Sequence, residues 1–409
     1  MRNFLDILIE KILFLKSKIE FQEEVPENEI EAYKVRIRNH KKAMYVRTAF
    51  FVILAAVLVL LGKYLIDHHR YSSYKVVTSE DKTDNISNYE YAGGEILRYS
   101  SDGASLLKTN LDAIWNVTFT MSQPAVDICE GTAAIYDKRG TSVYIYNAKG
   151  QLGTFSTGKP ILYGRVTKDG NFAAALEDGD TTWINYYTSQ GSEIATVSTN
   201  VKDPGYPVAL SLSHDGLFMA VSYLTAASGG TGTHLVFYNF GSAGKEKTDN
   251  EVAAEDFSGT VIPEVEYLSN TDAVAFRDNG FTVYKGSLLP KKTKSVDFDG
   301  EVVSTFYDSS HMGFIFKTED TGHKFVMKIY TTNGNLVSTS YVDLIFDKVR
   351  VCGDEVIFFN NTQMAVYSMR GFCRFSETLD EGEISDVLKT AANRYFVVTD
   401  MKAEIIKLT

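Results

Sequence analysis

The histidines are the side chains of this sequence best suited to binding a metal ion, but their spacing does not support a metal site. His214, His234, His311 and His323 are scattered, with no HxH or HxxxH pair that would bring two imidazole nitrogens to one ion. We therefore interpret these four as turn or surface histidines and predict no metal site.

The cysteines are too few and too far apart to form a structural framework. Cys129, Cys352 and Cys373 are an odd, sparse set that matches neither a disulfide scaffold nor a zinc pattern. We expect them to be small core residues. A bridge between Cys352 and Cys373 stays open, because both could fall in one structural repeat.

The motifs of common catalytic and cofactor sites are absent. There is no GxSxG nucleophile elbow, no Walker A loop and no GxGxxG between a strand and a helix. The glycine-rich run SGGTGT from Ser228 lies between two predicted strands, where we expect a flexible hairpin loop rather than a phosphate cradle. This pattern predicts no catalytic residue and no cofactor, and it favours a protein that is not an enzyme.

The same glycine-rich run belongs to a long loop that we predict to contact a partner. Long loops on a rigid scaffold often carry binding specificity. The candidate partner-binding residues are Thr225, Ser228, Gly229, Gly230, Thr231, Gly232 and Thr233. A second long insertion, residues 241–251, follows in the same structural repeat.

Charge is unevenly distributed along the chain. The formal net charge is -11, yet residues 1–47 carry ten Lys/Arg against eight Asp/Glu, which leaves 31 against 44, or -13, for the rest. Nucleic-acid binding needs a basic footprint. The acidic remainder therefore predicts no nucleic-acid partner and suits a cationic or neutral one.

One apolar segment is long enough to cross the lipid bilayer. Residues 48–66 read TAFFVILAAVLVLLGKYLI, whose only charge is Lys63 near one end. No small-x-small cleavage site follows, so we predict an uncleaved transmembrane signal-anchor helix. Basic residues cluster before it rather than after it, which predicts a cytoplasmic N-terminus and an extracytoplasmic C-terminal domain at the cell membrane.

The cytoplasmic segment, residues 1–47, begins with a second apolar pattern. Residues 4–21 read FLDILIEKILFLKSKIEF, with apolar residues at alternating spacings of three and four. This pattern predicts an amphipathic helix with one wide apolar face. Docking on a partner helix and lying in the inner leaflet are both open.

After residue 70 the sequence changes to short Val/Ile/Tyr/Phe-rich runs separated by turn residues. One apolar strand recurs about every 40 residues, each time followed by a more aromatic one, such as SVYIY from Ser142. The recurring strands begin near Glu95, Thr132, Phe172, Phe218, Ala273, Gly313, Glu355 and Tyr395. Four-stranded units repeated around a ring predict an all-β, eight-bladed β-propeller over residues 67–409, with seven blades as the alternative count.

The last unit lacks a fourth strand before Thr409. We predict that a strand near residues 75–80, KVVTSE, supplies it and closes the ring. Anchor and ring closure would then be covalently joined.

The repeats resemble WD40-like and quinoprotein-type (PQQ-like) propeller repeats, most visibly in DGASLLKTNLDAIWNVTF from Asp102 and NAKGQLGTFST from Asn147. Tail, anchor and repeat together resemble an uncharacterised family of single-pass bacterial membrane proteins with an extracytoplasmic propeller. The resemblance implies a fold and carries no catalytic residues to transfer.

Two functions are the main candidates from the sequence, and simple structural spacing is a third possibility. The first is a non-enzymatic binding, scaffold or sensor protein of the cell envelope with a protein or cell-wall partner. The second is an extracytoplasmic propeller enzyme, such as a hydrolase, a lyase or a quinone-dependent dehydrogenase. An enzyme needs several acids or histidines at equivalent positions around the channel, and we do not find that set in the sequence.

Overall fold

The fold was analysed in a computed structural model, which describes residues 29–82, 87–199, 204–227, 230–319, 322–380 and 382–409. The chain divides into two compact units, Met1–Ile66 and Asp67–Thr409. The amphipathic helix expected at residues 4–21 lies outside the described residues.

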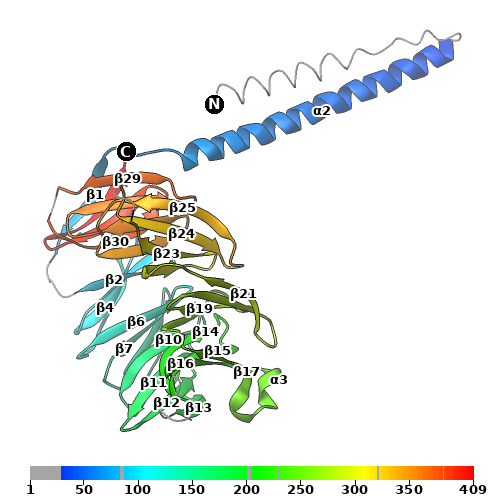
Figure 1. The fold of residues 1–409 in the computed structure, drawn as a ribbon. Coiled ribbons are helices and arrows are strands. Elements are labelled where there is room, and N and C mark those ends of the chain that lie inside the picture. The colour runs from blue at the N-terminus through cyan, green and yellow to red at the C-terminus, as the bar shows by residue number, and fades with distance from the viewer. Residues whose placement is uncertain (1–28, 83–86, 200–203, 228–229, 320–321, 381) are drawn as a thin grey trace. The chain divides into compact units, whose positions relative to one another are not determined.

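The first unit contains one long helix, α2 (Glu29–Asp67) (Figure 1). It is the only helix among the described residues that is long and apolar enough to span a membrane, over Tyr33–Gly62. The helix begins well before the predicted start at Thr48. The basic stretch before Thr48 contains no Pro or Gly and is rich in good helix formers, so nothing ends the helix there.

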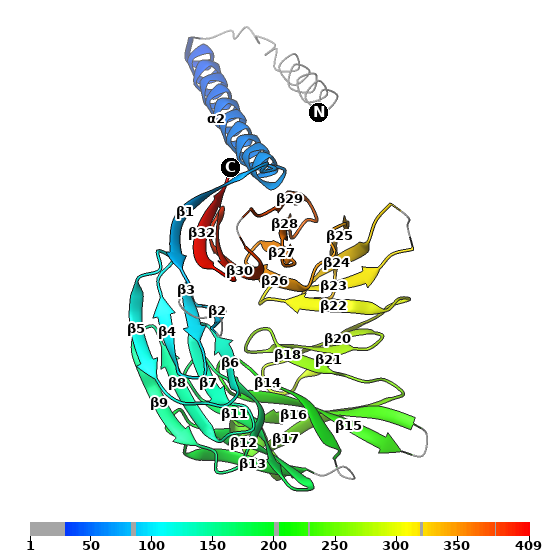
Figure 2. The ribbon, with the colours of Figure 1, turned by 90° about the vertical axis from the view of Figure 1, so that its left-hand side faces the viewer.

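The second unit is an eight-bladed propeller, which confirms the count of eight over seven. Each blade is a four-stranded antiparallel sheet, and the blades form a ring with the first strand of each blade innermost (Figure 2). The second insertion of blade 4, residues 241–251, contains the short helices α3 (Ser242–Lys245) and η1 (Thr248–Asn250).

The strand bounds follow the repeat. Blades 1 to 4 contain β2 (Asn88–Ala92), β3 (Glu95–Tyr99), β4 (Gly103–Leu107), β5 (Ala113–Thr118), β6 (Pro124–Cys129), β7 (Thr132–Asp137), β8 (Ser142–Asn147), β9 (Gly150–Ser156), β10 (Ile161–Val166), β11 (Phe172–Asp178), β12 (Thr181–Tyr187), β13 (Glu193–Thr199), β14 (Tyr206–Leu212), β15 (Phe218–Ala227), β16 (Gly230–Asn239) and β17 (Glu251–Ser258). Blades 5 to 8 contain β18 (Glu264–Tyr267), β19 (Asp272–Arg277), β20 (Gly280–Lys285), β21 (Lys291–Asp297), β22 (Val302–Tyr307), β23 (His311–Lys317), β24 (Phe325–Thr331), β25 (Leu336–Val342), β26 (Lys348–Cys352), β27 (Glu355–Phe359), β28 (Gln363–Ser368), β29 (Cys373–Thr378), β30 (Ile384–Ala391), β31 (Arg394–Thr399), β32 (Lys402–Leu408) and β1 (Tyr74–Asp81).

The core consists of apolar clusters between neighbouring blades, and the second strands supply both sides of it. In β27, Ile357 packs into the cluster shared with blade 8, whereas Val356 and Phe358 pack into the cluster shared with blade 6. A strand buried on both faces reads as a continuous apolar run. This is why the second strand is the clearest repeat in the sequence.

Blade 8 is completed by a strand from the N-terminal side. β1 pairs antiparallel with β32, from Tyr74 opposite Leu408 to Asp81 opposite Lys402. The backbone amides of Ser72 and Ser73 also donate to the carbonyl of Thr409 at 3.2 Å. The strand expected near residues 75–80 therefore pairs with the C-terminal strand and covers the edge of β32.

Candidate functional site

The first strands surround the channel, and all of them except β14 and β22 carry charged residues among their apolar ones. In β18, Val265 and Tyr267 are buried in blade packing, while Glu264 and Glu266 occupy the alternate face. The charged residues of these strands are Glu90, Asp127, Arg165, Glu264, Glu266, Lys348, Arg350, Asp386 and Lys389. They belong to six of the eight blades.

Arg165 on β10 links four blades across the channel. Its Nη1 donates to Asp127 Oδ1 of blade 2 at 2.9 Å, and its Nη2 lies 3.2 Å from Glu266 Oε2 of blade 5. Its Nε donates to the carbonyl of Leu210 in blade 4 at 3.0 Å. The other Asp127 oxygen accepts the Val166 amide at 2.6 Å. These bonds fix the guanidinium and both carboxylates in place.

Arg350 on β26 forms a second cluster of the same kind. We call each of these arginines, together with the carboxylates that it binds, a node. Its Nη1 donates to Glu90 Oε2 of blade 1 at 2.6 Å, and its Nε and Nη2 donate to the two oxygens of Asp386 of blade 8 at 3.2 and 2.8 Å. Burial opposes a charge on Arg350, but Asp386 and Glu90 more than offset it and raise the pKa of Arg350. The two-pronged contact with Asp386 is the strong form of an arginine–carboxylate pair.

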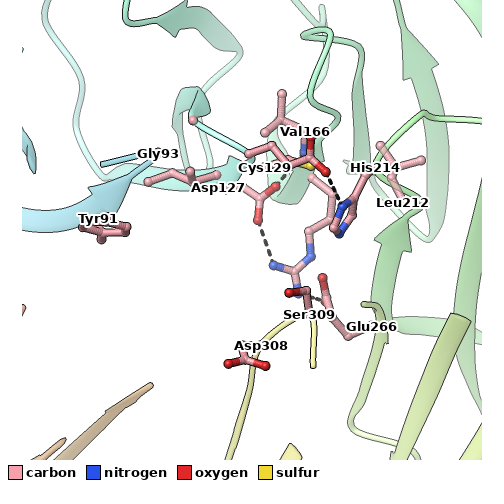
Figure 3. A pocket seen from close by; sticks show the side chains of 14 residues that line it. Tyr91, Gly93, Asp127, Cys129, Val166, Leu212, His214, Glu266, Asp308 and Ser309 are labelled. Carbon is pink, nitrogen blue, oxygen red and sulfur yellow. Dashed lines mark hydrogen bonds and ion pairs between the residues drawn. The ribbon is translucent and has the colours of Figure 1, made fainter. Parts of the chain in front are cut away.

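A cavity of about 420 Å³ lies beside the Arg165 node. Figure 3 shows Tyr91 and Gly93 on one side of it and Glu266 and His214 on the other. The cavity is at the end of the ring that carries the turns between first and second strands, which we call the AB end. Its lining residues are Tyr91, Gly93, Asp127, Ile128, Cys129, Glu130, Gly131, Arg165, Val166, Leu212, His214, Glu266, Asp308 and Ser309.

The rim of the cavity is held by contacts between turns. His214 Nδ1 lies 2.9 Å from Glu130 Oε1, and Thr132 Oγ1 donates to the carbonyl of Lys168 at 2.6 Å. Glu130 adopts a positive φ of 48° at the turn between β6 and β7, a conformation uncommon for a residue other than glycine. Asp308 Oδ1 accepts the amides of two residues in its own turn.

Burial shifts the proton equilibrium of two cavity groups. The pKa of Glu266 is raised to about 7, because burial outweighs the opposing attraction of Arg165. Burial, with Asp127, Glu130 and Glu266 nearby, raises the pKa of the Cys129 thiol to about 12. Cys129 is therefore a protonated thiol at neutral pH, which is a poor nucleophile.

Comparison with known proteins places the second unit in a family. The model of a family of unknown function, DUF5711, matches residues 67–408. The chain belongs to this family. Among curated proteins, none matches the chain significantly.

Solved structures show the fold of this DUF5711 member. BamB from Moraxella catarrhalis is 11% identical, with 82% of this chain and all of that chain covered at a TM-score of 0.51. Hsv2p from Kluyveromyces lactis is 8% identical, with coverages of 72% and 98% and a TM-score of 0.46. KlAtg21, solved with the coiled coil of AgAtg16, is 12% identical, with coverages of 72% and 99% and a TM-score of 0.49. At these identities the similarity to BamB establishes a shared propeller fold and nothing finer.

The four histidines that we interpreted as turn or surface residues do not converge in this DUF5711 protein. Each has its Nδ1 within 4 Å of a different carboxylate: Glu130 for His214, Asp256 for His234, Asp308 for His311 and Asp343 for His323. Within the described part of the chain, no group of three or more metal-ligating side chains could hold an ion.

The open question of a Cys352–Cys373 bridge is resolved by the sheet order. Both residues fall in blade 7, but on β26 and β29, the first and last strands of the sheet. Three strand spacings separate them by about 14 Å, well beyond the span of a disulfide. All three cysteines are free thiols.

The expected long loop of the candidate partner-binding residues is instead the end of a hairpin. β15 and β16 stay paired to their ends, with Thr225 opposite Gly232 and Ala227 opposite Gly230. Thr233 is buried, and its Oγ1 donates to the carbonyl of Thr260 at 3.1 Å. Ser228 and Gly229 lie outside the described residues. The ladder of blade 4 continues through residues whose composition suggested a loop.

The first strands bring acids to the channel that we did not single out from the sequence, where we looked for acids or histidines at equivalent blade positions. The acids are present, but they stand at non-identical positions and are interrupted by arginines, so a search for one repeated residue misses them. The available signal is an apolar–charged–apolar triplet just before a second strand, as in Val126-Asp127-Ile128, Val265-Glu266-Tyr267 and Val349-Arg350-Val351.

Proposed function

We propose that this DUF5711 protein is a membrane-anchored, non-enzymatic binding protein of the cell envelope. In this proposal α2 spans the bilayer once with the N-terminus in the cytoplasm, and the propeller binds a protein or cell-wall partner outside it. The apolar run in α2 and the basic residues that precede it support the anchor and its orientation.

One observation carries the binding function: the cavity walls are fixed by ion pairs and contain no activated nucleophile. Asp127, Arg165 and Glu266 are tied to one another, and Cys129 stays protonated because its pKa is raised to about 12. A largely pre-formed, partly enclosed pocket with a few fixed polar groups is typical of a recognition site. A nucleophile needs a neighbouring base to activate it, and the Cys129 environment disfavours the thiolate.

The test is site-specific photo-crosslinking of the full-length protein in its native membrane. A photoreactive residue replaces Tyr91, which is 42% exposed beside the cavity. Tyr206 is the matched control, because it is 43% exposed and opens the first strand of blade 4 at the opposite end of the ring. A specific partner captured from position 91 alone supports the proposal. Equal capture from both positions, or capture from neither, argues against it.

The β15–β16 hairpin is a second proposed contact with the partner. Replacing residues 226–231 by a two-residue turn removes only the tip of the ladder, since β14 pairs up to Leu224 and β17 pairs up to Gly232. We expect the variant to fold and to capture less partner. Undiminished capture would remove the hairpin from the proposal.

A hydrolase or lyase is the second candidate, favoured by the raised pKa of Glu266. A carboxylic acid with a pKa of about 7 in a cavity is suited to general acid–base catalysis. Screening wild-type protein and a Glu266→Gln variant against hydrolase and lyase substrates tests it. An activity present in the wild type and lost in the variant would favour the enzyme over the binding protein.

A further inference from the structure

The cavity at the AB end is wide enough for a small ligand, and its charge is one-sided. At about 420 Å³ it falls within the range of pockets that hold small molecules. Four of its lining residues are acidic, Asp127, Glu130, Glu266 and Asp308, whereas Arg165 is its only Lys or Arg. Deeper in the channel, Glu264 adds another carboxylate beside the same node.

We propose that this cavity binds an organic cation, a primary ammonium or guanidinium group, in contact with the Glu266 carboxylate. The inference rests on the proposed binding function and specifies the chemistry of its site. Such a group could come from a free polyamine or from a lysine or arginine side chain of a protein partner, and the experiment below separates these sources.

The Arg165 node lacks enough positive charge for the acids around it. One guanidinium serves both Asp127 and Glu266. The groups that face Glu266 are Arg165 on β10, Asp127 on β6, Ser211 on β14, Glu264 on its own strand and Tyr307 on β22. Only one of them is a cation, and burial together with Asp127 and Glu264 raises the pKa of Glu266 to about 7 against the attraction of Arg165. A ligand cation would provide the charge that the wall lacks.

The mouth of the cavity contributes an aromatic surface. Tyr91 is the last residue but one of β2, and its ring is 42% exposed where it lines the cavity. An exposed tyrosine next to carboxylates favours a cation over a neutral group, because the ring face attracts positive charge. An anionic ligand would meet four acids and one arginine that is already paired.

The experiment is a calorimetric titration of the full-length protein in detergent micelles at pH 6 and pH 8. The first probe is spermidine, a free polyamine. The second is a peptide whose only charged side chain is one lysine, and it represents a side chain of a protein partner. With a pKa of about 7, the ionised fraction of Glu266 rises about tenfold between these pH values. We expect at least one probe to bind about tenfold more tightly at pH 8.

Two variants locate the binding. Glu266→Gln should weaken binding and abolish its pH dependence. Glu301→Gln removes the same charge from an exposed position in the loop between β21 and β22, outside the cavity, and should leave both unchanged. Circular dichroism confirms that both variants are folded. Tighter binding of spermidine than of the peptide points to a free polyamine, and the reverse points to a protein side chain.

Three results would overturn the inference: no binding of either probe, binding with the same affinity at both pH values, or equal loss in both variants. The proposed function is judged separately. Specific crosslinking from position 91 without cation binding would leave the binding protein standing and remove only the cationic ligand. Cation binding without a captured protein would support a free small molecule as the natural ligand.

Discussion

The two arginine nodes of the channel are alike in construction and differ in what surrounds them. Arg165 in blade 3 and Arg350 in blade 7 are four blades apart in a ring of eight, so they lie on opposite sides of the channel. Their side chains are 31% and 25% exposed, and each binds two carboxylates from other blades. Only the Arg165 node borders the cavity.

The number of acids around each arginine separates a structural ion pair from a candidate binding site. At Arg350, two carboxylates accept the donors of one guanidinium, and Asp386 uses both of its oxygens. At Arg165, a third acid, Glu264, lies close to Glu266 through their shared partner Tyr307. Glu264 raises the pKa of Glu266 further. Its additional negative charge favours the cationic ligand that we propose.

The largest expected effect is on stability, from removing either arginine. Arg350→Met and Arg165→Met each leave two partly buried carboxylates without their cation. We expect each to lower the free energy of unfolding by about 2–3 kcal/mol, less than for a fully buried pair. Urea unfolding of the full-length protein in micelles measures this.

If only one of these variants is destabilised, the two nodes are not equivalent braces. Leu210 serves as the internal reference, because its carbonyl accepts from Arg165 alone and not from Arg350. A Leu210→Val control keeps that carbonyl and shortens a buried side chain, so we expect it to cost about 1 kcal/mol, less than the loss caused by Arg165→Met.

The next effect separates the nodes by pH. The pKa of Glu266 in the folded protein is about 7, above the value of about 4.3 in an unfolded chain. The folded protein therefore holds more protons than the unfolded chain in this window, and its stability falls as pH rises from about 4 to 7. Glu266→Gln lacks this loss and should be more stable than the wild type above pH 7, by about 1–3 kcal/mol.

Asp386→Asn is the matching change at the other node. It removes one of the two charge-assisted contacts with Arg350, so we expect a loss of about 1–3 kcal/mol at neutral pH. Thermal unfolding from pH 5 to pH 8 measures the change in stability of both variants relative to the wild type. A gain for Glu266→Gln and a loss for Asp386→Asn would distinguish the two nodes. Equal destabilisation would show that both acids are purely structural.

The smallest expected effect is that of Tyr91→Ala. Its exposed ring contributes little to the core, so the free energy of unfolding should change by less than about 0.5 kcal/mol, while binding of the cationic probe weakens. Tyr206→Ala, at the opposite end of the ring, should change neither stability nor binding appreciably. A large stability loss in Tyr91→Ala would mean that this ring is a packing residue.

The propeller could be predicted from sequence because its second strands are buried on both faces. Runs such as Glu355–Phe359 are short, apolar and regularly spaced, and burial alone dictates them. The extent of α2 was underestimated, because hydropathy locates the apolar run and says nothing about where the helical backbone begins. The hairpin of blade 4 was mistaken for a loop, because pairing within a sheet overrides the low strand preference of glycine.

The candidate site could not be predicted, because its contacts join distant parts of the chain. Arg350 and Glu90 are 260 residues apart, and Arg165 and Asp127 are 38 apart. Each is one charged residue in an apolar strand until the ring brings the first strands together. The burial of each acid and the charges around it depend on that geometry. The raised pKa of Glu266 therefore could not be predicted from the sequence.

The pairing of β1 with β32 also sets the order in which the molecule can be made. The side chains of Ser73 and Thr409 are hydrogen-bonded although they are 336 positions apart. All eight blades must therefore be synthesised before β1 can pair with β32. Until then β1 has an unpaired edge, and closing so long a loop is entropically slow. A chain stopped short of residue 402 would lack β32 and keep β1 unpaired, so we expect it to leave an exposed strand edge that invites aggregation.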